Sequence, residues 1–298
     1  MKTAGGEIDL NYNSALSIKA FLESRSLGMR KKYGQNFLIN GDVRAALASA
    51  LDAPPGEQVW EIGPGIGAMT AILLEKKLAV RAFEIDRGFV GALKDLFAGE
   101  GGFCLVEGDV MKTWGGQPPA PYLLGNLPYN IAAGLLADFI EKGRFFQRMV
   151  VTVQKEVAMR MYAKAGSDDY SSFSVLCSLF YTVKPLMLIR GGSFYPRPKV
   201  DSMGVLFEKR DPAPVCPPVF FPLLRALFAS RRKTLKNNLA AFAAARLGAE
   251  KERAEGICAR LLATNSLSGG ERAETLEPQV FLKLACSFLE EEGKKEKN

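Results

Sequence analysis

The feature that most constrains the fold is an alternation of short apolar runs with helix-like stretches between residues 57 and 153. Five runs have the length and composition of buried strands, namely Val59–Ile62, Val80–Ile85, Phe103–Val106, Tyr122–Leu124 and Met149–Val153. Amphipathic stretches lie between several of them, at Met69–Lys77, Phe89–Phe97 and Ile131–Lys142. This alternation predicts an α/β fold with a mostly parallel sheet covered on both faces.

The segments on either side extend this pattern. Residues 12–28 are typical of an amphipathic helix, and Asp42–Leu51 predicts a second one. A helix is expected near Glu156–Ala165. The strand-like runs Phe180–Ile189 and Gly204–Lys209 follow without a long helix between them, which favours an antiparallel pair at the sheet edge.

A proline-rich segment at residues 211–218 breaks the pattern, because four prolines in eight residues continue neither a sheet nor a helix. Beyond it every stretch is helix-like, at Phe220–Ala229, Thr234–Leu247, Lys251–Leu262 and Pro278–Glu290. We therefore expect an N-terminal helical extension (1–28), an α/β domain (29–210) and a small all-α domain (219–298).

The absence of histidine limits the chemistry. It excludes Ser-His-Asp and Cys-His nucleophilic systems and histidine-based metal sites. The cysteines are odd in number and widely spaced, without a C-x-x-C motif, which favours a reducing compartment over a disulfide framework or a zinc ribbon. Any reaction here must use amides, carboxylates, hydroxyls, backbone groups or a bound cofactor. We expect no metal.

The charge balance and the N-terminus suggest where the chain acts. Lys and Arg outnumber Asp and Glu by 39 to 32, a net charge of +7, which fits either solvated surface lysines or a polyanionic partner. Acidic residues interrupt the N-terminal segment, which does not resemble a signal peptide, and no apolar run is long enough to span a bilayer. We expect a cytoplasmic protein that does not bind membranes.

A glycine-rich loop with carboxylates after neighbouring strands predicts a nucleoside site. Gly63 and Gly65 follow the first predicted strand of the alternation and precede a helix. Glu84 ends the next strand, where a carboxylate can accept both ribose hydroxyl protons, and Asp109 ends the third. Strand-end acids are individually unremarkable, but together they lie where open α/β sheets bind ligands.

The spacing of the loop discriminates between cofactors. Dinucleotide sites prefer G-x-G-x-x-G, whereas this loop reads G-x-G-x-G and Pro64 removes one N–H donor. Glu61 places an acid just before the loop. Fewer donors and a nearby acid suit the zwitterionic amino acid and sulfonium of S-adenosylmethionine better than the diphosphate of NAD.

The turn Asn126-Leu127-Pro128-Tyr129 ends the fourth predicted strand. Such a turn often has only a structural role. It also suits methylation of adenine, whose exocyclic amine is a poor nucleophile. The Asn126 amide oxygen and the Leu127 carbonyl would accept its two N–H groups and aim its lone pair at a sulfonium methyl, while Tyr129 would stack on the base. No general base is required before attack.

Two further features would serve an RNA substrate. Phe194, in a proline-stiffened loop, is a candidate second stacking face for a flipped base, although a loop aromatic alone is more often a packing residue. Two basic clusters are candidate phosphate contacts, and they comprise Arg30, Lys31 and Lys32 near the N-terminus and Arg231, Arg232 and Lys233 near the C-terminal helices.

Eight segments together resemble the ribosomal RNA adenine dimethyltransferases, specifically the small-subunit (16S) enzymes. They are KKYGQNFL (31–38), EIGPGIGAMT (61–70), FEID (83–86), EGDV (107–110), GNLPYNI (125–131), VQKEVAMRM (153–161), SFYPRPKVDS (193–202) and SRRKTLKNN (230–238). The resemblance covers residues 29 to 290. It implies a Rossmann-like class I S-adenosylmethionine-dependent methyltransferase sheet with a small all-α C-terminal domain.

The resemblance also implies an activity and its site. The enzymes of this family transfer methyl groups from S-adenosylmethionine, leaving S-adenosylhomocysteine, to N6 of two adjacent adenosines in a hairpin near the 3′ end of 16S rRNA, within a pre-30S particle. Nothing in the sequence demands more than a monomer. The family's cofactor contacts match Asn36, Leu38, Gly63, Glu84, Asp109 and Asn126, and Gln35 and Gly65 lie in the same motifs.

Three other readings remain. The related 23S rRNA methyltransferases of macrolide resistance share similar motifs, but KVDS and SRRKTLKNN favour the 16S enzymes. A non-catalytic assembly factor would not need the intact turn from Asn126 to Tyr129. A nicotinamide oxidoreductase is disfavoured by the glycine spacing and the lack of histidine. The helix at residues 12–28 lies ahead of the family core and has no assigned role.

Overall fold

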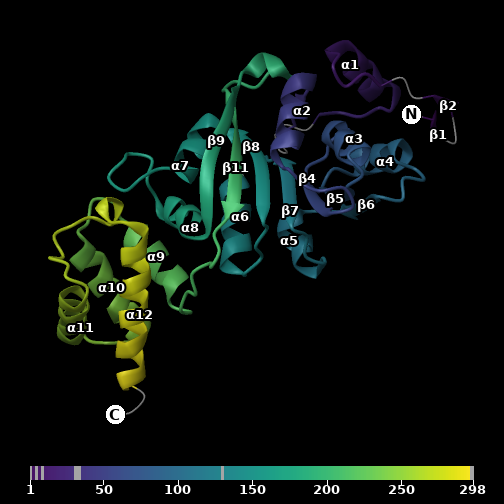
Figure 1. Ribbon diagram of the computed structural model, residues 1–298. Coiled ribbons are helices and arrows are strands. Elements are labelled where there is room, and N and C mark those ends of the chain that lie inside the picture. Colours follow the sequence, from purple (N-terminus) through teal and green to yellow (C-terminus); the bar gives the residue numbers. More distant parts are fainter. Residues whose placement is uncertain (1, 4–5, 8–9, 30–34, 129–130, 296–298) are drawn as a thin grey trace. The chain divides into compact units, whose positions relative to one another are not determined.

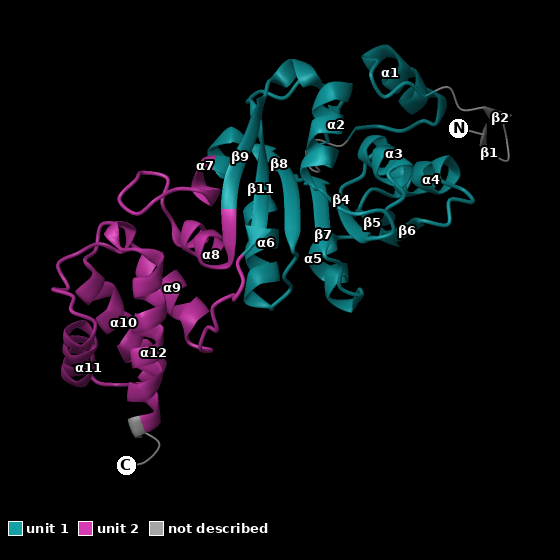
Figure 2. Ribbon diagram, in the orientation of Figure 1, with its two compact units in different colours: residues 1–158, 183–209 teal, residues 159–182, 210–298 magenta. Residues whose placement is uncertain are grey.

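A computed structural model describes residues 2–3, 6–7, 10–29, 35–128 and 131–295, with side chains from residue 10 to residue 293 of these ranges. It divides into two compact units (Figure 2), residues 1–158 with 183–209 and residues 159–182 with 210–298. The first unit holds the sheet and the second is helical.

The first unit contains a seven-stranded sheet in the order β6-β5-β4-β7-β8-β11-β9 (Figure 1). Its strands are β4 (Gln58–Ile62), β5 (Ala79–Glu84), β6 (Phe103–Glu107), β7 (Tyr122–Asn126), β8 (Arg148–Gln154), β9 (Tyr181–Ile189) and β11 (Ser202–Lys209). The strands β4 to β8 pair in parallel, and β11 pairs antiparallel with β8. This confirms the predicted mostly parallel sheet.

Short strands lie outside this sheet. They are β1 (Lys2–Thr3), β2 (Gly6–Glu7), β3 (Phe37–Leu38) and β10 (Phe194–Tyr195). The strands β1 and β2 pair with each other, and β10 pairs antiparallel with β3. Because β3 and β10 are far apart in sequence, their pairing brings the GQNF and SFYP segments together.

Helices cover both faces of the sheet because successive residues of a strand point to opposite sides. On β4, Val59 packs in one cluster with Leu47 and Leu73. The next residue, Trp60, is fully buried and makes edge contacts with the rings of Phe139 and Phe146. The helices of this unit are α1 (Ala15–Ser24), α2 (Gly41–Ala50), α3 (Ala68–Glu75), α4 (Arg87–Leu96), α5 (Val110–Thr113) and α6 (Ala132–Glu141), and the boundary between the units runs through α7 (Lys155–Met161).

Polar side chains cap the N-termini of several of these helices. Ser14 accepts a hydrogen bond from Ser17 N and caps α1, and Asn40 caps α2 through Val43 N. The helix α1 spans Ala15–Ser24, so the helix predicted over residues 12–28 is too long at both ends. Asp86 and Asp109 cap α4 and α5 in the same way.

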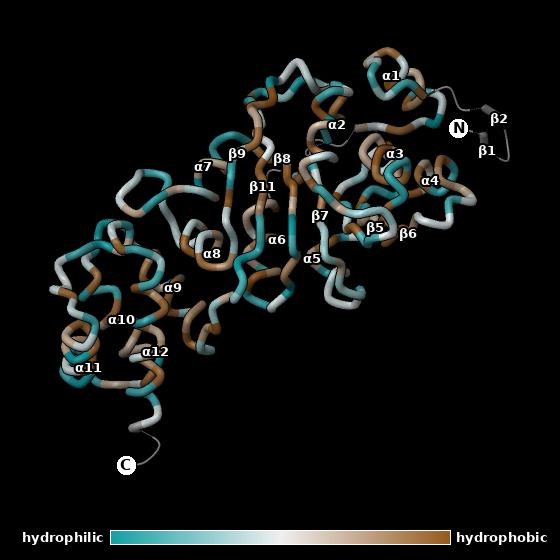
Figure 3. The backbone as a smooth tube through the Cα atoms, in the orientation of Figure 1, coloured by the Kyte–Doolittle hydropathy of each residue, from teal (hydrophilic) through white to brown (hydrophobic). Residues whose placement is uncertain are grey.

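The second unit is built from helices around an apolar core. They are α8 (Ser172–Phe180), α9 (Phe220–Phe228), α10 (Leu235–Leu247), α11 (Lys251–Thr264) and α12 (Pro278–Lys295). Apolar and polar stretches alternate along them (Figure 3), as expected for helices with one buried face. A short 3₁₀ turn of this unit lies at Ala273–Thr275, and the first unit has others at Trp114–Gly116 and Gly191–Ser193.

The compact units differ from the predicted domain ranges in two respects. The segment 1–28 belongs with the sheet unit, because α1 buries Ile18 and Phe21 in a cluster with Phe89. Residues 159–182 belong with the helical unit, where the Tyr170 hydroxyl donates to Leu276 O. The local sequence pattern cannot predict which unit either segment joins, because both associations depend on contacts between distant segments.

Candidate functional site

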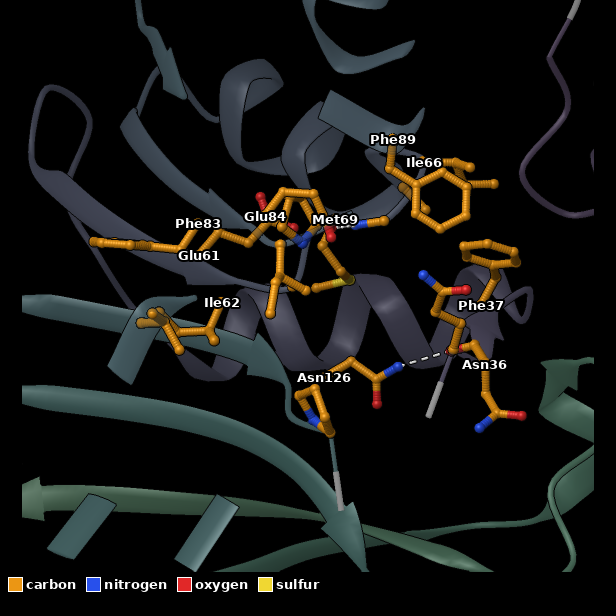
Figure 4. A pocket seen from close by; sticks show the side chains of 18 of the residues that line it. Asn36, Phe37, Glu61, Ile62, Ile66, Met69, Phe83, Glu84, Phe89 and Asn126 are labelled. Atoms are coloured by element: carbon orange, nitrogen blue, oxygen red, sulfur yellow. Dashed lines mark hydrogen bonds between the residues drawn. The ribbon is translucent and has the colours of Figure 1, made fainter. Parts of the chain in front are cut away.

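A cavity lies at the carboxyl ends of β4, β5, β6 and β7 and is shown in Figure 4. Its unfilled volume is about 930 Å³ with the open mouth included. All eight residues that the sequence predicts for cofactor binding line it, namely Gln35, Asn36, Leu38, Gly63, Gly65, Glu84, Asp109 and Asn126. A parallel sheet brings these positions together because its strand ends share one edge.

The glycine loop uses its N–H groups inside the protein. Gly63 N donates to Phe83 O at 3.0 Å, Gly65 N to Glu84 Oε2 at 3.1 Å, and Gly67 N to Pro64 O at 2.9 Å. All three glycines have positive φ. Since these donors are already paired, the glycines do not form the anion cradle that a diphosphate requires.

Glu84 forms a buried acceptor at one wall of the cavity. Its Oε1 accepts from Asp86 N at 2.8 Å, and its Oε2 accepts from Gly65 N. Burial raises the pKa of Glu84 to about 7, although these N–H groups favour the ionised form. Each carboxylate oxygen can accept more than one hydrogen bond, so Glu84 retains capacity for a ribose hydroxyl.

Two further acids line the cavity. Asp109 Oδ1 accepts from Met111 N at 3.0 Å, so one oxygen caps α5 while the side chain remains partly exposed. Glu61 is buried, and its Oε2 accepts from the Thr70 hydroxyl at 2.6 Å. Burial, with a smaller contribution from the nearby Glu84, raises the pKa of Glu61 to about 7, although the hydrogen bond from Thr70 favours the ionised form.

Asn126 is fixed in orientation at the end of β7. Its Nδ2 donates to Asn36 O at 2.9 Å, as the dashed line in Figure 4 shows. This bond engages the donor end of the amide and leaves Oδ1 as an acceptor. The next residue, Leu127, is buried, and its N–H donates to Thr152 O on β8 at 3.0 Å. The backbone of the turn is therefore held by the neighbouring strand up to Pro128, which also lines the cavity.

Apolar side chains that the sequence analysis does not single out complete the cavity. Ile85, next to Glu84, is 40 % exposed and offers an apolar surface. The rings of Phe37 and Phe89 meet edge to face at 5.6 Å between centroids. Ile85 lies inside the FEID motif and Phe37 inside KKYGQNFL, and these motifs are the sequence feature from which their place in the cavity could have been predicted. Phe89 has no such feature, because in the sequence it resembles any apolar residue of a helix.

Phe194 does not lie where it could stack on a base in the cavity. It is 3 % exposed and packs in the core with Leu47 and Ile189, and it does not line the cavity. Its strand pairing with Leu38 turns the ring toward the apolar cluster between α2 and the sheet. In this conformation Phe194 is a packing residue.

The basic residues divide into three groups. Arg231 pairs with Glu274 at 2.8 Å and donates to Asp168 O, so its charge is already compensated within the helical unit. Arg232 and Lys233 are exposed, and within the described part of the chain their side chains make no ion pair. The predicted contacts Arg30, Lys31 and Lys32, and the predicted stacking residue Tyr129, lie outside the described residues.

Membrane-spanning helices and metal-binding clusters are absent from the described ranges. Within them, no helix combines the length and apolar character needed to cross a bilayer. In the same ranges, no three Cys, Asp or Glu side chains are grouped closely enough to hold a metal ion.

Comparison with known families identifies relatives of the chain. The family profile described as "Ribosomal RNA adenine dimethylase" matches residues 27–263. A protein of Treponema denticola named "Ribosomal RNA small subunit methyltransferase A" is 43 % identical over 288 residues, covering 92 % of this chain and 94 % of the relative. One of the same name from Borreliella afzelii is 41 % identical, covering 79 % and 84 %.

Solved structures show the same architecture. A dimethyladenosine transferase from Plasmodium falciparum superposes with a TM-score of 0.72 at 26 % identity, covering 85 % of this chain and 97 % of its own. The 23S rRNA methyltransferase ErmE gives a TM-score of 0.60 at 20 % identity, covering 84 % and 98 %. The second likeness concerns the fold alone.

We expect Glu61→Gln to weaken the pH dependence of stability. Folding raises the Glu61 pKa from 4.5 to about 7, so the folded protein binds more protons than the unfolded chain between these values. The stability contributed by this group is complete below pH 4.5 and is lost as the pH rises toward 7. Glutamine keeps an acceptor for Thr70 and does not ionise.

Urea unfolding without ligand at about pH 5 and about pH 8 measures this effect. The difference in the free energy of unfolding between the two pH values should shrink by on the order of 1–3 kcal/mol in Glu61→Gln. Glu57→Gln, at an exposed glutamate just before β4, controls for the loss of one carboxylate. Equal pH dependence in Glu61→Gln and the wild type would contradict the assignment.

Proposed function

The chain belongs to the ribosomal RNA adenine dimethylase family, and on that premise we propose that it dimethylates N6 of two adjacent adenosines near the 3′ end of 16S rRNA. The methyl donor is S-adenosylmethionine and the products are N6,N6-dimethyladenosine and S-adenosylhomocysteine. The reaction takes place in the cytoplasm on a pre-30S particle, with the protein acting as a monomer. Support for the small-subunit target comes from relatives at 41–43 % identity whose names carry it.

The cavity fits the proposed cofactor in the chemistry of its donors and acceptors. The paired glycine N–H groups disfavour a diphosphate, while Glu84 supplies an acceptor for ribose hydroxyls. Asp109 has one oxygen outside its capping bond, and Ile85 offers an apolar surface for a base. When bound, S-adenosylmethionine supplies a methyl group made electrophilic by its positively charged sulfur.

The observation that carries the proposal is the fixed amide of Asn126. Its Nδ2 is held by Asn36 O, so Oδ1 is available to accept one N–H of an adenine amine. The Leu127 carbonyl accepts the second N–H. Two acceptors on one nitrogen draw its lone pair out of conjugation with the ring and direct it, which is catalysis by orientation and preorganised dipoles.

Proton transfer needs no residue of its own before attack. The nitrogen becomes acidic once it is alkylated, so the proton can leave afterwards to water. This sequence of events suits a chain without histidine. Tyr129 would stack on the target base, and the exposed cations Arg232 and Lys233 would contact RNA phosphates.

The alternative functions are less well supported. A 23S rRNA target rests on a structural likeness at 20 % identity, which concerns only the fold. A non-catalytic assembly factor would have no use for an asparagine oriented by a dedicated hydrogen bond in the cavity. Methyl transfer to under-methylated small subunits, read by a primer-extension stop near the 3′ end of 16S rRNA, distinguishes all three.

We expect Asn126→Ala to lower kcat for methyl transfer by about 100-fold or more, because the variant loses the acceptor that orients the amine. The assay uses under-methylated small subunits at saturating S-adenosylmethionine. An unchanged unfolding midpoint would show that the variant is folded. Wild-type turnover by this variant would end the proposed mechanism.

We expect Glu84→Gln to bind S-adenosylhomocysteine about 10- to 100-fold more weakly near pH 8, because ribose hydroxyls lose a charged acceptor. In the free protein the Glu84 pKa is about 7, and the ionised form accepts the hydroxyls. Wild-type affinity should therefore rise with pH through 7 and then level off, whereas the variant should lose this rise.

Isothermal titration calorimetry between about pH 6 and pH 8.5 tests this expectation. Glu57→Gln again serves as the control for removing a carboxylate from the same unit. A full pH-dependent rise in affinity in Glu84→Gln would exclude Glu84 as the ribose acceptor.

We expect the double variant Arg232→Ala/Lys233→Ala to bind rRNA more weakly and with less salt dependence. Loss of two phosphate contacts should reduce the slope of log K against log salt by about 1.5 to 2. Arg231 is left in place because it pairs with Glu274. Lys251→Ala/Lys283→Ala removes the same charge from exposed positions of α11 and α12. Equal slopes in the two double variants would show that Arg232 and Lys233 are solvated surface residues without a specific role in RNA binding.

A further inference from the structure

The segment 10–27, which we name the N-terminal strap, is built into the wall of the cavity. Its helix α1 buries Ile18, Phe21 and Leu22, which are at most 5 % exposed. They pack in one cluster with Phe37 and Phe89, two side chains that line the cavity. The strap therefore lies directly behind residues that the cofactor would touch.

Both ends of the strap are attached to the sheet unit. At its C-terminal end, Arg25 Nη1 and Asp95 Oδ2 on α4 lie 2.6 Å apart. At its N-terminal end, Asn13 approaches the start of α2 so closely that a Cβ on Gly41 would lie 2.7 Å from Asn13 Oδ1. The absence of a side chain at position 41 is what permits this approach.

Arg44 connects the strap to the cavity. Its side chain is buried, and Nη2 donates to Asn13 Oδ1 at 2.6 Å. Its Nη1 donates to Leu38 O at 2.6 Å and to Tyr12 O at 3.1 Å. Thus one guanidinium joins two residues of the strap to the short strand β3.

The acceptors of Arg44 are unusual for a buried cation. Within the described ranges no carboxylate pairs with it, and burial lowers its pKa. Burying a guanidinium without a counter-ion costs free energy, and Arg44 Nε is already buried without a hydrogen-bond partner, so the bonds of Nη1 and Nη2 to neutral acceptors carry the compensation. Removal of the Asn13 amide would take this fixed acceptor away from Nη2, and because Asn13 is exposed only mobile water could replace it.

A short stretch of backbone connects the residue that Arg44 holds to the residue that holds the proposed catalytic amide. Leu38, held by Arg44, lies two residues after Asn36 in the segment that lines the cavity. Asn36 O accepts the bond that orients Asn126. A shift of the Leu38 carbonyl would move the short segment 36–38 and, with it, the acceptor that holds Asn126.

We propose that Asn13 and Arg44 are positioning residues for methyl transfer, and that the N-terminal strap orients Asn126 through Leu38 and Asn36. The proposal rests on the proposed role of Asn126. It gives the strap, which lies ahead of the motifs that resemble the family, a function in the reaction rather than in stability alone.

The variant Asn13→Ala tests the proposal with two companions. Asn13→Asp keeps an acceptor for Arg44 Nη2 and should restore activity. Lys19→Ala, on the exposed face of α1, is the matched control on the same segment. We expect Asn13→Ala to lower kcat about tenfold at saturating S-adenosylmethionine with KM for the small subunit unchanged, the size of one hydrogen bond to a charged group. Asn13→Asp and Lys19→Ala should stay within about twofold of wild type.

A purely structural strap predicts a different result. It would lower the unfolding midpoint of Asn13→Ala and leave kcat unchanged at temperatures well below that midpoint. That outcome would overturn the proposal, as would failure of Asn13→Asp to restore kcat. A second pair of variants checks the path, because Asn13→Ala should add nothing to the loss of kcat in Arg44→Lys if both act through the same guanidinium. Additive losses would contradict it.

The Asn126→Ala variant, measured in the same assay, separates the two proposals. An inactive Asn126→Ala beside a wild-type Asn13→Ala would refute the strap and keep the proposed function. Turnover by Asn126→Ala would refute the role of Asn126 itself, and the proposed action of the strap on it would fall as well.

Discussion

One hydrogen bond, from Asn126 Nδ2 to Asn36 O, joins parts of the chain that lie 90 residues apart and defines the site. Asn126 ends a strand in the middle of the sheet, whereas Asn36 belongs to a short segment ahead of it. The sheet supplies a rigid position and the segment supplies an orientation. An amide needs both to present a lone pair in a fixed direction, since either end of its side chain can otherwise face the ligand.

The rest of the cavity combines carboxylate acceptors with glycine donors that are already paired. The glycine N–H groups are paired internally, and Glu61, Glu84 and Asp109 provide oxygens. Such a set suits a ligand rich in hydroxyl and amino groups with a positive centre, and it opposes an anionic one. The two buried acids titrate near pH 7, in a range that histidine would otherwise cover.

The sequence predicts the sheet and most of the cavity because both depend on local pattern. The runs around Val59 and Val80 alternate with helices, and strand ends of a parallel sheet must meet at one edge. It does not predict that Phe194 is buried, since the loop around it carries no periodicity and the pairing of β10 with β3 decides its environment. Arg44 is likewise invisible in the pattern, because a charged residue on an amphipathic helix is ordinarily exposed.

The outer strand β9 carries a further consequence in its sequence Lys184-Pro185. Strands at the margin of a sheet expose unpaired backbone groups that can recruit a strand from another molecule and start aggregation. Proline has no N–H to offer, so Pro185 removes one donor from this strand, and Lys184 beside it pairs with Glu208 on β11. A proline and a charged pair at the margin of a sheet both make it a poorer template for an added strand.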